Sequence, residues 1–126
     1  MTIEEVKHLF HKELGLPPEV DKLEGRTFNL RYSRHAQTAC VSDRYGIIKP
    51  PMLLPVRRDQ IVEAELFNGW VLKATVRIPY NAVYDLVLVI MPERYGEAFV
   101  KTCWLNRKDD THRTLDRSKY QTYSIA

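Results

Sequence analysis

Cysteine is scarce in this sequence: Cys40 and Cys103 are its two thiols, and they lie far apart in the chain. They form no Cys-x-x-Cys pair, which excludes the common zinc and dithiol motifs. We also expect no secretion signal, because charged residues at positions 4, 5 and 7 interrupt the N-terminal segment. Two thiols in such a chain fit a reducing cytoplasm (the host cytoplasm if the chain is phage-encoded), where we expect both to be buried as small apolar side chains.

Long apolar runs are absent as well. No segment approaches the roughly 20 apolar residues of a membrane-spanning helix, so we expect no membrane partner. The net charge of +3 is small and no dense basic run occurs, which permits a nucleic-acid partner without requiring one. Asp109, Asp110 and His112 lack the spacing of metal ligands, so neither a metal nor another cofactor is expected.

What is present predicts one α+β domain. A chain of 126 residues with 44% hydrophobic side chains can bury a single core. The capping box Thr2-Ile3-Glu4-Glu5 predicts a first helix. A second helix is predicted from Ser33, a good N-cap, to about Tyr45, with Gly46 ending it in a left-handed conformation. Its inner face would carry small side chains and pack closely: Ala36, Ala39 and Cys40.

Strands are predicted at residues 60–67, 70–78, 84–91 and 98–105. Asn68-Gly69 is typical of a two-residue hairpin turn, and the third strand is apolar on both faces, which favours a central position. Residues 48–55 contain three prolines and are expected to be irregular or at an edge, while residues 27–30 are expected to be only briefly extended.

Short connections favour an antiparallel meander. We therefore predict two N-terminal helices packed on a four-stranded antiparallel sheet in residues 1–105. Residues 106–126 are predicted to be a polar C-terminal extension packed on or near that domain. Residues 101–119 contain six Lys or Arg and three Asp, an excess as large as the net charge of the whole chain. The positive balance is thus expected at one end of the sheet.

Several short motifs resemble the RelE/ParE/BrnT toxin-like superfamily. Ser33, His35 and Ala36 are similar to its helix start, and Asp43-Arg44-Tyr45-Gly46 is similar to its helix end. The segment Val100-Lys101-Thr102 resembles the last strand of the family, so the resemblance covers roughly residues 28–105. Two further segments look like an extension in small bacteriophage members, Trp104-Leu105-Asn106 and Asp110-Thr111-His112.

The resemblance implies an RNA-binding domain and leaves open whether it is a metal-independent ribonuclease. Such cleavage needs a base, an acid and cations for the phosphate. The candidate catalytic residues are His35 as base and His112 as acid. The candidate residues for binding RNA or a partner are Arg34, Lys73, Arg77, Lys101, Trp104 and Arg113.

Each candidate also has a structural interpretation. His35 can simply bond to neighbouring backbone, and Lys73 and Arg77 can pair with glutamates of the adjacent strand. Trp104 can belong to the core or anchor the extension. A rival hypothesis is a phage-encoded inhibitor that keeps the fold without catalysis and binds a bacterial host protein. A third is a homodimer formed through sheet edges.

Overall fold

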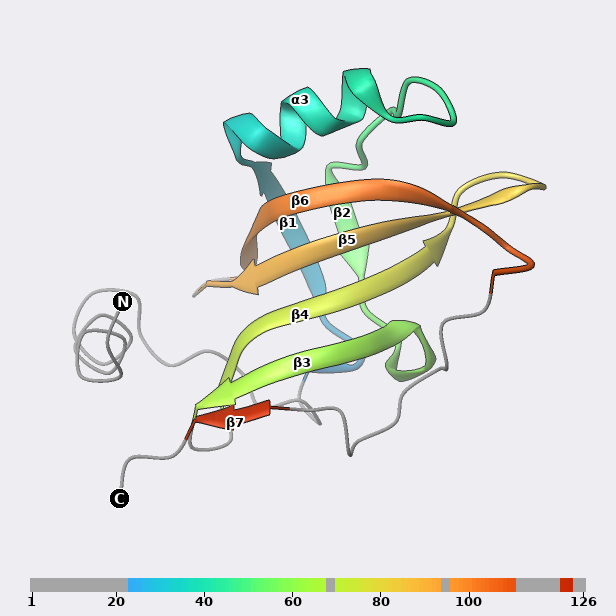
Figure 1. Cartoon of the computed structure of the whole chain (residues 1–126). Helices are drawn as coiled ribbons and strands as arrows, with labels where there is room; N and C mark the ends of the chain where they lie inside the picture. Colours follow the sequence, from blue (N-terminus) through green and yellow to red (C-terminus); the bar gives the residue numbers. More distant parts are fainter. Residues whose placement is uncertain (1–22, 68–69, 94–95, 111–120, 124–126) are drawn as a thin grey trace.

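The computed structural model describes residues 23–67, 70–93, 96–110 and 121–123 (Figure 1). The predicted first helix lies outside these residues. In chain order the elements are β1 (Thr27–Tyr32), α3 (Arg34–Ser42), β2 (Leu53–Pro55), a 3-10 turn η2 (Arg58–Gln60), β3 (Ile61–Phe67), β4 (Trp70–Pro79), β5 (Tyr84–Pro92), β6 (Glu97–Arg107) and β7 (Gln121–Tyr123).

The strands form one curled, mixed sheet in the order β2-β1-β6-β5-β4-β3-β7. Strands β3 to β6 make the antiparallel meander that the sequence predicts. Beyond them, β1 runs parallel to β6, and β7 runs parallel to β3. The described residues include one complete α-helix, α3. The prediction of two helices on a four-stranded antiparallel sheet is therefore wrong, because the sheet has more strands, is mixed in direction and is accompanied, within the described residues, by one complete helix.

The main error concerns β1, which the sequence indicated only as a brief extension. Phe28 and Leu30 are buried while Thr27, Asn29 and Arg31 are exposed, as expected for a strand with one face on a core. The strand pairs with β6, whose residues follow about seventy positions later in the chain. A short alternating pattern does not specify such a distant parallel partner.

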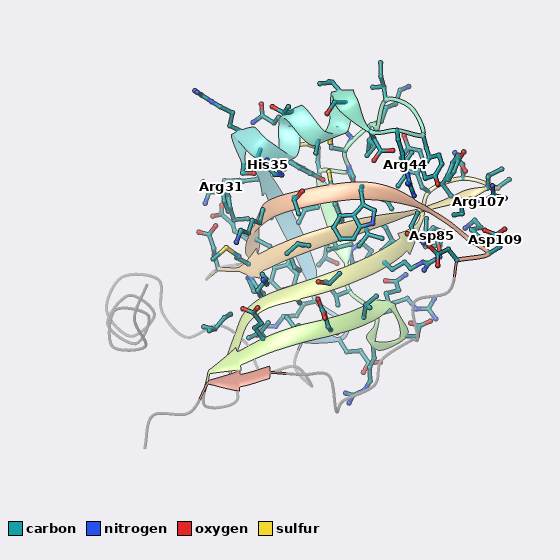
Figure 2. All side chains as sticks on the ribbon, viewed as in Figure 1. Arg31, His35, Arg44, Asp85, Arg107 and Asp109 are labelled. Atoms are coloured by element: carbon teal, nitrogen blue, oxygen red, sulfur yellow. The ribbon has the colours of Figure 1, made fainter. Side chains whose placement is uncertain are left out.

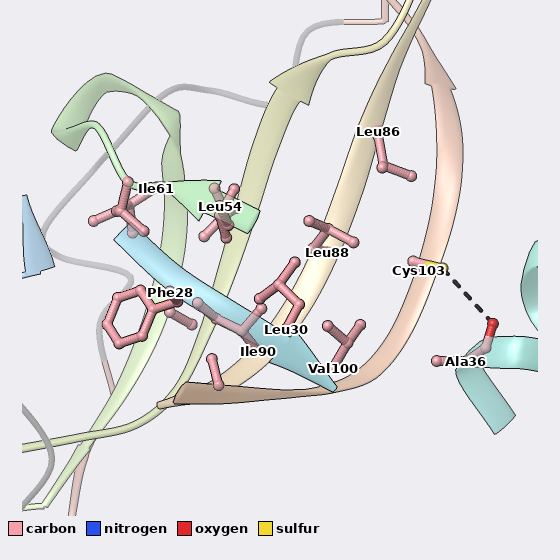
Figure 3. Packing of buried hydrophobic residues seen from close by; sticks show 14 of the residues in the cluster. Phe28, Leu30, Ala36, Leu54, Ile61, Leu86, Leu88, Ile90, Val100 and Cys103 are labelled. Atoms are coloured by element: carbon pink, nitrogen blue, oxygen red, sulfur yellow. Dashed lines mark hydrogen bonds between the residues drawn. The ribbon is translucent and has the colours of Figure 1, made fainter. Parts of the chain in front are cut away.

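The core fills the inside of the curl, between β1 and β2 on one side and β4, β5 and β6 on the other (Figure 3). The largest of its fully buried side chains come from β1, β2, β3 and β5 and from the segment before β1: Leu23, Phe28, Leu54, Ile61, Leu86, Leu88 and Ile90. Each such side chain contributes about 2 kcal/mol of hydrophobic stabilisation. β5 has neighbours on both sides, and Val87 and Leu88 are buried on its opposite faces, as predicted for a central strand.

Helix α3 lies close to β6 because its inner side chains are small. Ala36 and Cys40 are buried there, as predicted. The helix ends at Ser42, three residues earlier than expected, and Asp43 follows as its C-cap. Gly46 does adopt a positive φ of 121°, but in the turn after the helix, where its amide donates to the Asp43 carbonyl.

Candidate functional site

One corner of the molecule joins the end of β1, the start of α3 and an irregularity in β6. Val89 of β5 pairs with Thr102 and Ile90 pairs with Val100, so Lys101 is an extra residue in β6, a β-bulge. The Ser33 hydroxyl donates to the Lys101 carbonyl at 2.8 Å and accepts from the Ala36 amide at 2.9 Å. A single side chain therefore caps α3 and holds the helix start on the bulge.

We call Ser33, Arg34, His35 and Lys101 the Ser33 corner. Three predicted site residues meet here, and the side chains of Arg34, His35 and Lys101 are all exposed. Helix α3 contains no acidic residue. Amides in the first turn of a helix have no acceptor four residues earlier, and the helix dipole makes this end positive. The corner therefore offers two full positive charges and backbone donors to an anion such as a phosphate.

Arg31 lies at the same end of the molecule as His35 (Figure 2). Its Nη2 is 2.6 Å from Oε1 of Glu93, and its guanidinium lies 5.5 Å from the centre of the Phe99 ring. The charge of Arg31 is thus compensated locally. Arg34 and Lys101 are the stronger attractors for an anion at this corner.

Arg77 occupies a different place, near the opposite end of the sheet, where its partner Asp85 lies. Its Nε donates to Asp85 at 2.7 Å, and two further donors bind the carbonyls of Asp110 at 2.6 Å and Arg107 at 2.9 Å. The Arg77 side chain is only 12% exposed. These hydrogen bonds hold the turn that follows β6, so Arg77 is separated from the Ser33 corner and engaged by the protein itself.

Asp85 is the acidic centre of this cluster, and Lys108 binds its other oxygen at 2.7 Å. Partial burial by itself raises the pKa of the Asp85 carboxyl. Hydrogen bonds and charge from Lys108 and Arg77 outweigh that effect and place the pKa below the ordinary value of 3.8. A carboxyl whose pKa is lower in the folded state than in the unfolded state stabilises the fold above the unfolded pKa.

We expect this contribution to disappear as the pH falls through the folded pKa of Asp85. The difference in free energy of unfolding between the protein and an Asp85→Asn variant should be constant near neutral pH and should shrink below about pH 4. Urea unfolding at a series of pH values measures it. If the stability difference between the two proteins persisted at the lowest pH of the series, the charge of Asp85 would not be its cause.

Lys73 and Trp104 lie on the outer face of the sheet. Lys73 pairs with Glu65 at 3.1 Å, which confirms the predicted pairing across β3 and β4 for this residue. Trp104 is half-buried and pairs with Val87 of β5. It lines an open hollow of about 420 Å³ between the end of α3 (Ala39 and residues 42–44) and residues 103–106 of β6.

Asp43, which the sequence pointed to only as part of the helix-end motif, has a structural role at this hollow. Its Oδ1 accepts from the Leu105 amide at 3.2 Å, and its Oδ2 accepts from the Tyr45 amide at 3.0 Å. Past Val100, no strand among the described residues pairs with β6 on the side of β1, because β1 ends at Tyr32. Asp43 therefore satisfies a donor on an uncovered strand edge. An acidic residue directly after a helix was the signal available in the sequence.

His112 and Arg113 lie outside the described residues. Within the part of the chain that the structure describes, no group of three or more His, Cys, Asp or Glu could hold a metal ion. Among the same residues, no helix has the length and apolar character needed to cross a membrane. In residues 23–110, apart from the short gaps, no hydrogen bond or ion pair joins the His35 side chain to another residue.

The chain was compared with family models, with curated proteins and with solved structures, and none of them matches it. The resemblance to the toxin-like superfamily stays a prediction from the motifs given above. The functional proposal below therefore rests on the geometry of the Ser33 corner.

Proposed function

We propose that the Ser33 corner of this domain binds RNA by contacting the phosphate groups of the RNA backbone. The observation that carries the proposal is that the Ser33 hydroxyl joins the start of α3 to the bulge at Lys101. Two predicted RNA-contacting side chains, Arg34 and Lys101, are thereby anchored at one place on a rigid framework. Cations placed in this way neutralise phosphates and carry no base specificity by themselves.

The surroundings of the corner favour an anionic ligand. Arg31, at the same end of the molecule, forms an ion pair with Glu93, so that carboxylate is already engaged. Helix α3 itself contributes no carboxylate that could repel an anion. The first-turn amides add directed donors to the charges of Arg34 and Lys101. A phosphodiester supplies the two unesterified oxygens that such a set of donors can bind.

Binding, rather than cleavage, is the function that the described residues support. General acid–base cleavage needs two titratable groups placed on either side of the reacting phosphate. His35 is one such group, and the predicted acid, His112, is outside the described residues. The proposal therefore rests on the cations of the corner and assigns no step of catalysis to His35.

Charge reversal at the corner tests the proposal. We expect the double variant Arg34→Glu/Lys101→Glu to bind a short labelled single-stranded RNA at least about tenfold more weakly at low salt. The slope of log affinity against log salt should become shallower by about 0.7 for each phosphate that the variant no longer neutralises. Fluorescence anisotropy over a salt series measures both quantities.

Arg57→Glu is the matched control, since Arg57 is a well-exposed arginine outside the corner and its substitution makes the same kind of charge reversal. It should leave affinity and slope close to those of the unchanged protein. The control reverses one charge and the double variant reverses two, so a loss of log affinity in the control that is half as large as in the double variant would mean that only net charge matters. An absence of RNA binding at low salt would reject the proposal outright.

A protein partner is the second candidate, because large apolar side chains are exposed in residues 41–53. The side chains in question are Val41, Ile47, Met52 and Leu53, with exposed fractions of 55–73%. Exposed apolar side chains that are contiguous on the surface mark protein interfaces, and these four lie within one short segment of the chain. The two candidates differ in the salt dependence of binding, which is steep for RNA and weak for an apolar interface.

A further inference from the structure

The two cysteines, which are distant in sequence, are in contact in the fold. The Sγ atoms of Cys40 in α3 and Cys103 in β6 lie 3.3 Å apart, and both residues are free thiols. The Cys103 thiol also donates to the Ala36 carbonyl at 3.8 Å (Figure 3). A disulfide bond has an S–S length of about 2.05 Å, so the sulfurs need to approach by only about 1.3 Å.

The surroundings permit this approach. The face of α3 that meets β6 carries small side chains, which let the helix lie close to the strand. Both cysteines are less than 5% exposed, so neither is offered directly to solvent. Cys103 is nevertheless one of the residues that line the open hollow beside Trp104, so the hollow is the side from which a reagent would approach it.

We infer that Cys40 and Cys103 form an intramolecular disulfide bond when the protein meets a low-molecular-weight disulfide such as oxidised glutathione. The Cys103 thiolate attacks one sulfur of the reagent and releases one glutathione thiolate. The Cys40 thiolate then attacks the Cys103 sulfur of the mixed disulfide and releases the second. Two protein thiols are oxidised, one glutathione disulfide is reduced to two thiols, and the two thiol protons pass to the released glutathiones.

The reaction should be slow and the product stable. Burial is the main cause that raises the pKa of the Cys103 thiol to about 12, followed by the hydrogen bond with Cys40, so little thiolate is present at neutral pH. The bond would close a loop between residues 40 and 103 and restrict the unfolded chain. It would also fasten α3, which carries Arg34 and His35, to β6, which carries Lys101.

The test uses the whole chain, incubated in buffers of increasing oxidised-to-reduced glutathione ratio until no further change occurs. The protein is then unfolded, alkylated and weighed by mass spectrometry. We expect a species that lacks two hydrogen atoms and takes up no alkylating reagent. The thermal midpoint is measured on a separate portion of the same sample that has not been treated with denaturant. It should exceed that of the reduced protein by roughly 10 °C.

Cys40→Ala and Cys103→Ala are the controls, and neither should show a thermal midpoint that depends on the redox buffer. If either variant folds poorly, the oxidised and reduced forms of the unchanged protein still decide the question. Two alkylatable thiols after full incubation would overturn the inference. A stable glutathione adduct on one cysteine, or a disulfide-linked dimer, would overturn it as well.

Discussion

Replacing Arg77 by alanine is expected to lower the free energy of unfolding by about 3 kcal/mol. The substitution removes one partner of a mostly buried ion pair and leaves Asp85, 17% exposed, with Lys108 alone. It also leaves the carbonyls of Arg107 and Asp110 without the guanidinium that binds them. The mostly buried Asp85 carboxylate accounts for most of the cost, because a buried group that loses a partner is not fully rehydrated, whereas the two carbonyls belong to exposed residues. Urea unfolding followed by circular dichroism measures the decrease.

Lys73→Ala is the matched control for this experiment, because Lys73 lies on the same strand and also forms one ion pair. Its side chain is 30% exposed and its partner Glu65 is 32% exposed. An ion pair of this exposure contributes at most about 1 kcal/mol. Similar decreases in the two variants would contradict the anchoring role that the structure gives to Arg77.

Replacing Asp43 by alanine is expected to cost about 2 kcal/mol. The carboxylate accepts hydrogen bonds from two backbone amides, those of Leu105 and Tyr45. Leu105 lies in β6 and is only 4% exposed. The Leu105 amide is partly buried, so water replaces the missing acceptor less well than it would at a fully exposed amide. Hydrogen exchange should report the change locally, with faster exchange at the Leu105 amide.

Asp43→Asn and Asp59→Ala complete this second experiment. Asparagine keeps one acceptor oxygen, so Asp43→Asn should fall between the unchanged protein and the alanine variant. Asp59 is 68% exposed and pairs only with exposed Arg57 in the described structure, so Asp59→Ala should change stability little. Unchanged exchange at Leu105 in Asp43→Ala would show that the amide finds another acceptor.

The meander could be predicted because its signals are local. Alternation in β4 and the apolar run in β5 gave their positions to within one or two residues of Trp70–Pro79 and Tyr84–Pro92. The hairpin signal at residues 68–69 agrees with the antiparallel pairing of Phe67 with Trp70. Ser33 was also predicted correctly as the N-cap of α3. Each of these features depends on residues within a few positions of one another.

Local sequence signals predicted the contacts of the candidate site residues only in part. Lys73 was predicted to pair with a glutamate of β3, and it does, because neighbouring strands of a hairpin face each other directly. The partner of Arg77 was missed, since Asp85 reaches it through the register of β4 and β5. The structural interpretation of the sequence had instead offered the glutamates of β3 as partners for Arg77.

By itself the sequence determined the local elements: the N-cap at Ser33, the hairpin strands, the central strand and the small inner face of α3. The tertiary structure alone decided the parallel partner of β1, the bulge at Lys101 and the meeting of Cys40 with Cys103. These features join residues more than sixty positions apart or depend on a shift in register. The free energy that stabilises these features comes from curling the sheet around a shared core. No local periodicity encodes which distant strand pairs with which edge of the meander.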